Sequence, residues 1–142
     1  MQRSFRLSAR TIELLDELAD RLAQSRNGVA ERLLDEGLRT ERHPLIFFRE
    51  GAGGLRRPAL VGTRLFVWQV IDTLRQNDNR VAAAADYLGL SEQQIRGTVA
   101  YYADFTAEVD GYQAQALAYE ALERERWERA ERVLGSDEIA AR

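Results

Sequence analysis

The start of the chain constrains the fold most, because it predicts one short strand with no partner strand beside it. Residues 2–7 alternate between a polar face, with Ser4 and Arg6, and an apolar face, with Phe5 and Leu7. This is the period of a half-buried strand. A single strand of this length makes no stable sheet, and an unpaired edge is a liability. We therefore expect a second copy of the chain to supply the partner strand.

Two short amphipathic helices are predicted directly after this strand. Ser8 is a candidate N-cap, and apolar residues then recur at a spacing of three and four to about Gln24, which is typical of one helical face. Ser25 is a second N-cap candidate, before a helix that ends near Thr40. Residues 1–42 thus form a unit of strand, helix, turn and helix.

This unit resembles the ribbon-helix-helix family of bacterial DNA-binding proteins over FRLSARTIELLDELADRLAQSRNGVAERLLDEGLR, about a quarter of the chain. The resemblance implies that two chains pair their strands into an antiparallel ribbon, which enters the major groove of DNA. It also implies a homodimer through residues 1–40, whose helices bury their apolar faces together. Arg3 departs from the pattern, since it occupies an inward strand position that the family usually fills with an apolar residue.

The candidate DNA-binding residues lie on the outward face of the strand and at the start of the second helix: Gln2, Ser4, Arg6, Ser25, Arg26 and Asn27. Arg6 fits the O6 and N7 atoms of guanine, Gln2 fits the N6 and N7 atoms of adenine, and Ser4 serves either base. At the second helix, free backbone N–H groups and the Arg26 charge are expected to hold a phosphate. The alternative is that these arginines only form a solvated face.

A second segment begins after His43 and Pro44. LIFFRE, the glycine cluster GAGG and LRRPALVGTRLFV predict a small β-hairpin with a further extended stretch. Three helices are expected to follow, at about residues 68–76, 80–88 and 91–105, with Ser91 as the N-cap of the third. GAGG is interpreted as a hairpin turn rather than a phosphate-binding loop, because no Gly-Lys-Ser/Thr follows it.

Two stretches of this segment resemble the domain-of-unknown-function 433 family, a helix-turn-helix-like module found in antitoxins and their relatives. They are RPALVGTRLFVWQVIDTL and VAAAADYLGLSEQQIRGTVAYYADFTAEVD, roughly residues 58–110, and GTR at residues 62–64 is the most recognisable string. Within them five residues have the spacing of a helix-turn-helix: Ala85, Leu88, Gly89, Leu90 and Ile95.

The helix that would read DNA in such a module is poorly suited to that task. It is expected to expose four residues, only one of them basic: Glu92, Gln93, Gln94 and Arg96. Because phosphate neutralisation dominates affinity for DNA, we favour a protein-contact or dimer-extending role for this module. A nearby aromatic cluster is interpreted as core, with a partner pocket as the alternative: Trp68, Tyr101, Tyr102 and Phe105.

From Thr106 a helical pattern continues to about Leu134, and we expect this tail to be too polar to belong to the core. Its apolar stripe is interrupted: Val109, Tyr112, Ala116, Tyr119, Trp127, Ala130 and Leu134. Glu and Arg four residues apart support the helix, at Glu120 with Arg124, Glu125 with Arg129, and Glu128 with Arg132. A thin stripe with aromatic residues suits a helix that lies in a groove of another protein. The alternative is packing on its own domain or on the dimer mate.

A ribbon-helix-helix head joined to this second module resembles antitoxins of type II toxin–antitoxin pairs whose toxin is a PIN-like ribonuclease. The resemblance implies that the head binds operator DNA of its own operon and that the rest wraps the toxin and blocks its Mg²⁺-carboxylate site. The candidate toxin-binding residues lie in the tail: Tyr119, Arg124, Arg126, Trp127 and Arg129. A guanidinium among metal-binding carboxylates replaces the charge of the cation. The alternative is a stand-alone ribbon-helix-helix transcriptional regulator, with the second module for oligomerisation or effector binding.

Composition argues against other function classes. The chain has no cysteine and one histidine, His43, which disfavours thiol nucleophiles, thiolate zinc sites and His-rich metal sites. We therefore expect no enzymatic activity, no cofactor and no metal site, and we interpret four aspartates as exposed positions: Asp72, Asp78, Asp86 and Asp104. No apolar run approaches the ~18 residues of a membrane span, and MQRSFRLSAR lacks the apolar region of a signal peptide. A cytoplasmic protein is expected, without membrane contact and associated with the nucleoid when bound to DNA.

The charge distribution suggests two different partners. Residues 1–10 carry three arginines and no acid, whereas residues 106–142 carry nine acids and five arginines. The predicted fold is mainly α. It consists of a ribbon-helix-helix domain over residues 1–42, a hairpin and three-helix helix-turn-helix-like domain over residues 43–105, and a C-terminal amphipathic helix and tail over residues 106–142.

Overall fold

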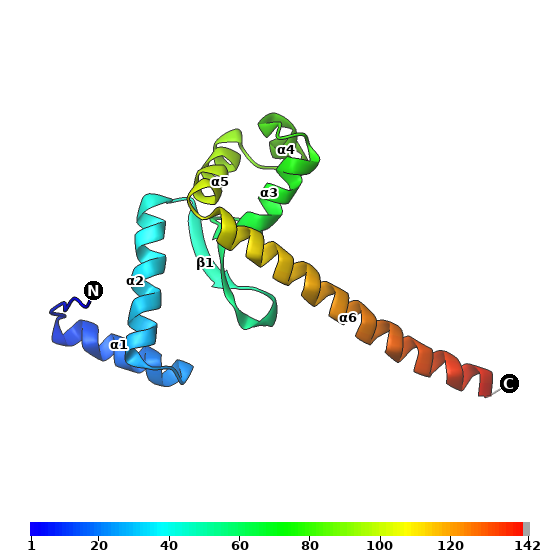
Figure 1. Ribbon diagram of the computed structural model, residues 1–142, viewed down its shortest axis with the longest axis horizontal. Helices are drawn as coiled ribbons and strands as arrows, with labels where there is room; N and C mark the ends of the chain where they lie inside the picture. The colour runs from blue at the N-terminus through cyan, green and yellow to red at the C-terminus, as the bar shows by residue number, and fades with distance from the viewer. Residues whose placement is uncertain (141–142) are drawn as a thin grey trace. The chain divides into compact units, whose positions relative to one another are not determined.

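The computed structural model describes residues 1–140, and the chain divides into two compact units, one of residues 1–44 and one that begins at Leu45. Figure 1 labels the helices and strands of both units. Of the helices in the described part of the chain, none combines the length and the apolar character that crossing a membrane requires.

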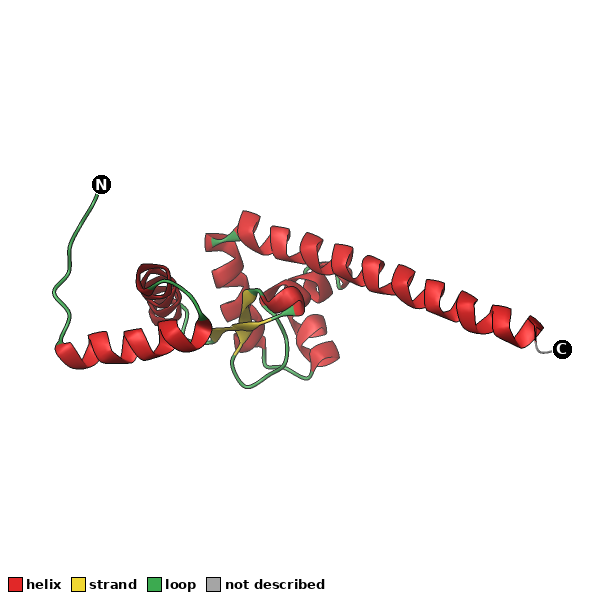
Figure 2. Ribbon diagram, turned by 90° about the horizontal axis from the view of Figure 1, so that it is seen from below, coloured by secondary structure: helices red, strands yellow, loops and turns green. Residues whose placement is uncertain are grey.

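The first unit contains helices α1 (Ala9–Leu22) and α2 (Arg26–Arg42). Ser8 Oγ accepts a hydrogen bond from the backbone N–H of Thr11 at 3.2 Å, and Ser25 Oγ accepts one from that of Gly28 at 3.1 Å. Both serines therefore act as N-caps, and both predicted helices are confirmed. Residues 1–8, the N-terminal arm, form neither helix nor strand and appear as a loop in Figure 2.

The core of this unit is small. Leu15, Ala19 and Val29 are its buried apolar residues, and Leu18 and Ala30 pack against them. Two helices alone have only one shared face to bury, so most leucines of α1 and α2 stay in contact with solvent.

The second unit opens with the predicted hairpin. Strands β1 (Ile46–Glu50) and β2 (Arg56–Leu60) pair antiparallel, with Ile46 opposite Leu60. The glycine cluster forms a 3₁₀ turn, η1 (Ala52–Gly54). Within it Gly53 has a φ of 77°, a left-handed value that glycine adopts without strain. The interpretation of GAGG as a hairpin turn is confirmed.

Helices α3 (Val67–Gln76), α4 (Val81–Leu88) and α5 (Glu92–Asp104) follow within a residue or two of the predicted bounds. Gly89 ends α4 with a φ of 67°, and Ser91 caps α5. Of the five residues with helix-turn-helix spacing, Ala85 and Ile95 are buried in one apolar cluster with Val70, Leu74 and Ala84, and Leu88 and Leu90 pack against it.

A second apolar cluster joins the hairpin to the helices, and the aromatic residues belong to it. Tyr101 is fully buried, and its ring centroid lies 4.7 Å from that of Phe105. Trp68, Tyr102 and Phe105 pack against this cluster while staying partly exposed. The core interpretation of these aromatics is therefore confirmed for Tyr101, with the other three at the edge of the core.

Helix α6 (Thr106–Ala140) begins inside the same unit and then leaves it. Val109 and Ala116 are only 1% and 6% exposed, and Val109 lies in the cluster with Ile46 and Tyr101. The expectation that the tail is too polar for the core is thus wrong for its first turns, because their apolar side chains face the rest of the unit. Figure 1 shows the remainder of α6 extending away from α3, α4 and α5.

Candidate functional site

The three candidate base-reading residues lie on the N-terminal arm, where the single chain leaves them exposed. Gln2, Ser4 and Arg6 are all in contact with solvent. Phe5, between them, is 78% exposed, which is unfavourable for so large an apolar ring. The strand expected over residues 2–7 requires a second chain to pair with, so it stays a prediction.

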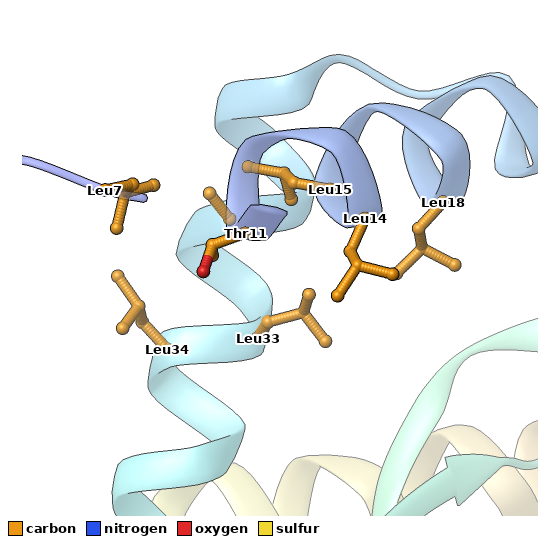
Figure 3. Close-up of a pocket in the computed structure, with 8 residues that line it drawn as sticks. Leu7, Thr11, Leu14, Leu15, Leu18, Leu33 and Leu34 are labelled. Carbon is orange, nitrogen blue, oxygen red and sulfur yellow. The ribbon is translucent and has the colours of Figure 1, made fainter. Parts of the chain in front are cut away.

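An apolar groove of about 330 Å³ runs between the arm and the two helices of the first unit. Figure 3 shows leucines from the arm, α1 and α2 around it. Its lining is almost entirely aliphatic: Leu7, Thr11, Leu14, Leu15, Leu18, Ala30, Leu33 and Leu34. Leu14 and Leu34 are 50% and 58% exposed. Contiguous exposed apolar surface of this kind marks an interaction site.

At the start of α2 the structure differs from the sequence-based prediction in one respect: the Arg26 side chain is engaged in an ion pair. Its guanidinium donates to both carboxylate oxygens of Asp16 on α1, and the longer of the two bonds is 2.9 Å. This hydrogen bond and the charge of Asp16 raise the pKa of Arg26. A phosphate at this helix start must therefore compete with Asp16 for Arg26, while Ser25 is already the helix cap and Asn27 is exposed.

Sequence reasoning missed this ion pair because the partners are ten residues apart and lie on different helices. The turn between α1 and α2 brings them together. In the sequence, the one feature that hints at this ion pair is an acidic residue on the first helix together with an arginine at the start of the second.

In the second unit, the exposed face of α5 carries the one predicted basic residue, but one of its four predicted residues is not exposed. Glu92, Gln93 and Arg96 are exposed, but Gln94 is half-buried. Its Oε1 accepts from the backbone N–H of Ser91 at 2.8 Å, and its own N–H donates to Ser91 Oγ at 3.1 Å. The expectation of an exposed Gln94 is wrong, because this residue completes a capping box.

The GTR string occupies a tight loop, residues 61–65, between β2 and α3. Thr63 Oγ1 donates to the carbonyl of Leu60 at 2.9 Å and accepts from the N–H of Leu65 at 3.0 Å. The N–H of Leu60 in turn donates to the carbonyl of Leu65 at 2.9 Å. Gly62 adopts a φ of 77°, which permits the reversal. Glycine and threonine thus have structural roles, and the third residue, Arg64, is exposed.

Two arginines of the hairpin are held without a carboxylate partner in the described part of the chain. Arg49 and Arg57 lie opposite each other in the register, so their side chains share one face. Arg57 is 3% exposed, and its one hydrogen bond to a described residue is to Gln115 Oε1, at 3.4 Å. Arg49 lies 3.8 Å from the ring centroid of Phe66 and donates to the carbonyl of Arg64. The Nε atoms of both are buried and have no hydrogen-bond partner among the described residues. Sequence reasoning did not single out this cluster.

The candidate partner-binding residues of α6 lie beyond its buried first turns. Tyr119 and Trp127 are 42% and 64% exposed. Trp127 therefore does not pack back on its own unit, and that alternative is wrong for this residue; packing on a second chain stays open. Arg124 is exposed.

The remaining two arginines of α6 make contacts along the helix. Arg126 binds Glu123 Oε1 at 2.8 Å, and Arg129 Nε donates to the backbone carbonyl of Glu125 at 3.4 Å. The side-chain pair predicted between Glu125 and Arg129 is thus replaced by a bond to the backbone.

The start of α6 is tied to α3 and α5 by a polar network. Tyr102 OH donates to Asp110 Oδ1 at 2.8 Å, and Arg75 donates to Tyr102 OH and lies 3.5 Å from Asp110. Burial and the bond to Asp110 raise the pKa of Tyr102. Asp72 accepts from Gln113 Nε2 at 3.1 Å, so this aspartate also has a structural partner.

The described residues contain no cluster of three or more His, Cys, Asp or Glu that suits a metal ion.

The second unit is mainly helical, with one two-stranded antiparallel hairpin and the long helix α6. Residues 55–102, from the end of the hairpin turn to α5, match the model of a family described as a protein of unknown function, DUF433. The predicted DUF433 module is thereby confirmed over these residues. Searches of curated proteins and of solved structures returned no match.

Proposed function

We propose that the chain is the antitoxin of a type II toxin–antitoxin pair, which neutralises a PIN-like ribonuclease and represses its own operon. The observation that carries the proposal is that two separate apolar surfaces are uncovered in the described part of the chain. One is the groove of the first unit, and the other is the outer part of α6 with Trp127. Two such surfaces suit two different partners.

The first surface suits a second copy of the chain. The arm carries an alternating pattern, has no strand partner among residues 1–140, and lines the apolar groove through Leu7. Pairing two arms would cover Phe5 and the leucines of the groove and would turn Gln2, Ser4 and Arg6 to one outer face. That face matches the donor and acceptor groups of the major groove of operator DNA.

The second surface suits a different protein. The outer part of α6 combines exposed aromatic residues with arginines, the residue types that anchor protein interfaces. Tyr119 and Trp127 would fill apolar pockets of the ribonuclease, and Arg124, Arg126 and Arg129 would face its acidic groups. Arg126 and Arg129 would exchange their contacts along the helix for contacts with the partner.

The proposal is tested by co-expression with the product of the neighbouring reading frame, followed by co-purification and an assay of ribonuclease activity. A stable complex that lacks the activity of the free neighbour supports it. Sequence-specific DNA binding without any complex would instead support a stand-alone ribbon-helix-helix regulator.

The DNA-binding part has its own test. Arg6→Ala should weaken binding to the operator by about 1–3 kcal/mol and reduce sequence preference. Equal weakening on operator and random duplexes would mean that Arg6 does not read bases.

A further inference from the structure

We infer that Arg49 and Arg57, which share one face of the hairpin, bind a phosphate group, either as the free anion or as part of a small molecule. The site lies within the second unit, where the guanidinium of Arg57 meets α6. This inference goes beyond the proposed function and does not depend on it, because it concerns a ligand of the chain alone.

Two positive charges face each other across the hairpin without a negative partner. Arg49 and Arg57 are opposite each other in the register, so their Cβ atoms are about 5 Å apart, a position at which like charges destabilise a strand pair. Arg57 is also only 3% exposed, and neither arginine forms an ion pair with the described residues. Burial of an unpaired charge is costly, so an anion held by both arginines would offset a cost that the free chain carries.

The hydrogen-bonding groups of this pair are donors that lack acceptors. A guanidinium carries several N–H groups. Among the described residues, however, Arg49 donates one hydrogen bond, to the carbonyl of Arg64, and Arg57 donates one, to Gln115 Oε1. The Nε atoms of both are buried without a partner among these residues. Because buried donors in native proteins are normally satisfied, a ligand rich in oxygen acceptors is the chemical complement of this pair.

Aromatic rings flank the two side chains and leave their N–H groups available. The guanidinium carbon of Arg49 lies 3.8 Å from the ring centroid of Phe66, and that of Arg57 lies 5.7 Å from the ring centroid of Tyr112. A guanidinium against a ring face keeps its N–H groups in its own plane, where they can reach an acceptor. Gly51 lets Arg57 and Phe66 come close together, since a Cβ atom there would lie 3.2 Å from both Arg57 Cδ and Phe66 Cζ. Donors positioned in advance lose little order when a ligand binds.

A small anion can reach Arg57 by moving one side chain. Gln115 is exposed, and its bond to the terminal nitrogen of Arg57 is long, at 3.4 Å. Rotation of Gln115 removes one weak bond to a neutral amide, and phosphate would replace it with charge-assisted bonds, which are about twice as strong. The rest of the Arg57 side chain is buried, so neither a DNA duplex nor a folded protein can follow. The ligand is therefore small.

A phosphate group matches this pair better than a carboxylate. It carries close to two negative charges at pH ~8, one for each arginine, and its oxygens can accept from both guanidinium groups at once. A carboxylate carries a single charge and would leave one of the two arginines without a negative partner.

The test titrates the full-length chain with sodium phosphate at pH ~8, by calorimetry and by melting temperature, with sodium chloride at matched ionic strength as the reference. Wild type should bind one phosphate per chain and should melt at a higher temperature in phosphate, because a ligand of the folded state stabilises it. Arg57→Met and Arg49→Met should each raise the dissociation constant about 10- to 100-fold, the loss of a charge-assisted hydrogen bond. Arg96→Met, at an exposed arginine on α5, is the matched control and should leave the constant nearly unchanged.

The stability of Arg57→Met separates a binding role from a packing role. In phosphate-free buffer this variant should melt at or above the wild-type temperature, because it loses a buried unpaired charge and keeps most of the apolar stem. Its melting temperature should no longer respond to phosphate. If this variant does not fold, Arg49→Met decides in its place.

Three results overturn the inference. One is a wild-type chain that responds to phosphate no more than to chloride. Another is methionine variants that bind phosphate as tightly as wild type, which would mean that the arginines serve packing only. The third is acetate that binds as tightly as phosphate, because a singly charged anion should bind at least about 10-fold more weakly.

A phosphate monoester identifies the source of the phosphate group. Tighter binding of adenosine monophosphate than of inorganic phosphate supports the inference with a small phosphorylated molecule as the ligand. Equal or weaker binding supports it with the free anion as the ligand.

Discussion

Leu34→Ala should weaken the homodimer without unfolding the chain. Leu34 lies on α2 at the apolar groove, and 58% of its surface is exposed in the single chain. Burying a whole leucine side chain stabilises by about 1.5–3 kcal/mol, so the exposed part offers about 1–1.7 kcal/mol to a partner. In a symmetric dimer the same contact forms twice. The expected loss is therefore about 2–3.5 kcal/mol per dimer, or a dissociation constant raised about 30- to 300-fold.

Sedimentation velocity over a series of concentrations measures this change directly. Leu55→Ala is the matched control, because Leu55 is 51% exposed but belongs to the second unit, outside the predicted dimer. It should leave the dissociation constant within a factor of about two. Alanine has a high helix propensity, so α2 should keep its helical content, which circular dichroism checks.

Two results would refute this reasoning. One is a wild-type chain that stays monomeric at tens of micromolar, which would mean that the groove has no second copy as its partner. The other is an equal effect of Leu34→Ala and Leu55→Ala, which would mean that general hydrophobicity and not this groove determines association.

The remaining predictions concern the other surfaces and the network at the start of α6. Trp127→Ala should lower affinity for the ribonuclease about 100-fold, because burying the exposed 64% of its side chain offers about 3 kcal/mol. The melting temperature should stay unchanged. Tyr87→Ala, at an aromatic residue on α4 that is 76% exposed, is the control and should change neither the affinity nor the melting temperature. Asp16→Asn should release Arg26 from its ion pair, so affinity for random duplex DNA should rise. The slope of log affinity against log salt concentration should steepen by about 0.9 for each further phosphate that is neutralised. An unchanged slope would remove Arg26 from the phosphate-binding residues. Tyr102→Phe should lower the free energy of unfolding by about 0.5–1.5 kcal/mol at about pH 8, because it removes the bond to Asp110. The raised pKa of Tyr102 keeps its proton in the folded state while the unfolded tyrosine ionises near pH ~10. Its contribution is therefore full below that pH and is lost as the pH rises through the raised pKa of the folded state, so the difference in urea unfolding between wild type and variant should shrink as the pH is raised above ~10.

Local signals explain why the helix boundaries were predictable. Ser8, Ser25 and Ser91 each cap a helix in the structure, as the sequence suggested. A cap acts over three residues, and the periodicity of an amphipathic helix is visible over a few turns. Gly89 is equally local, because its left-handed φ decides where α4 ends. None of these features depends on how distant parts of the chain meet.

Contacts between distant residues explain what was not predictable. Arg26 meets Asp16 because α1 and α2 fold against each other, and Arg57 contacts Tyr112 and Gln115 because α6 lies against the hairpin. An arginine in a short basic strand is ordinarily assigned to the surface. Its burial therefore has no signature in the sequence, although the excess of arginine over acid in the hairpin is visible there.

The apolar stripe of α6 illustrates the limit of pattern reasoning most clearly. Along the sequence it is a single interrupted stripe, and its spacing does not show which of its residues pack on the second unit and which remain exposed. In the structure the exposed fraction rises from 6% at Ala116 to 42% at Tyr119. The same helical face thus serves the core of the second unit for its first turns and has no described neighbour afterwards. An exposed apolar stripe on a helix that is anchored at one end loses little further order on binding, which is the physical reason for proposing this outer part as a surface for another protein.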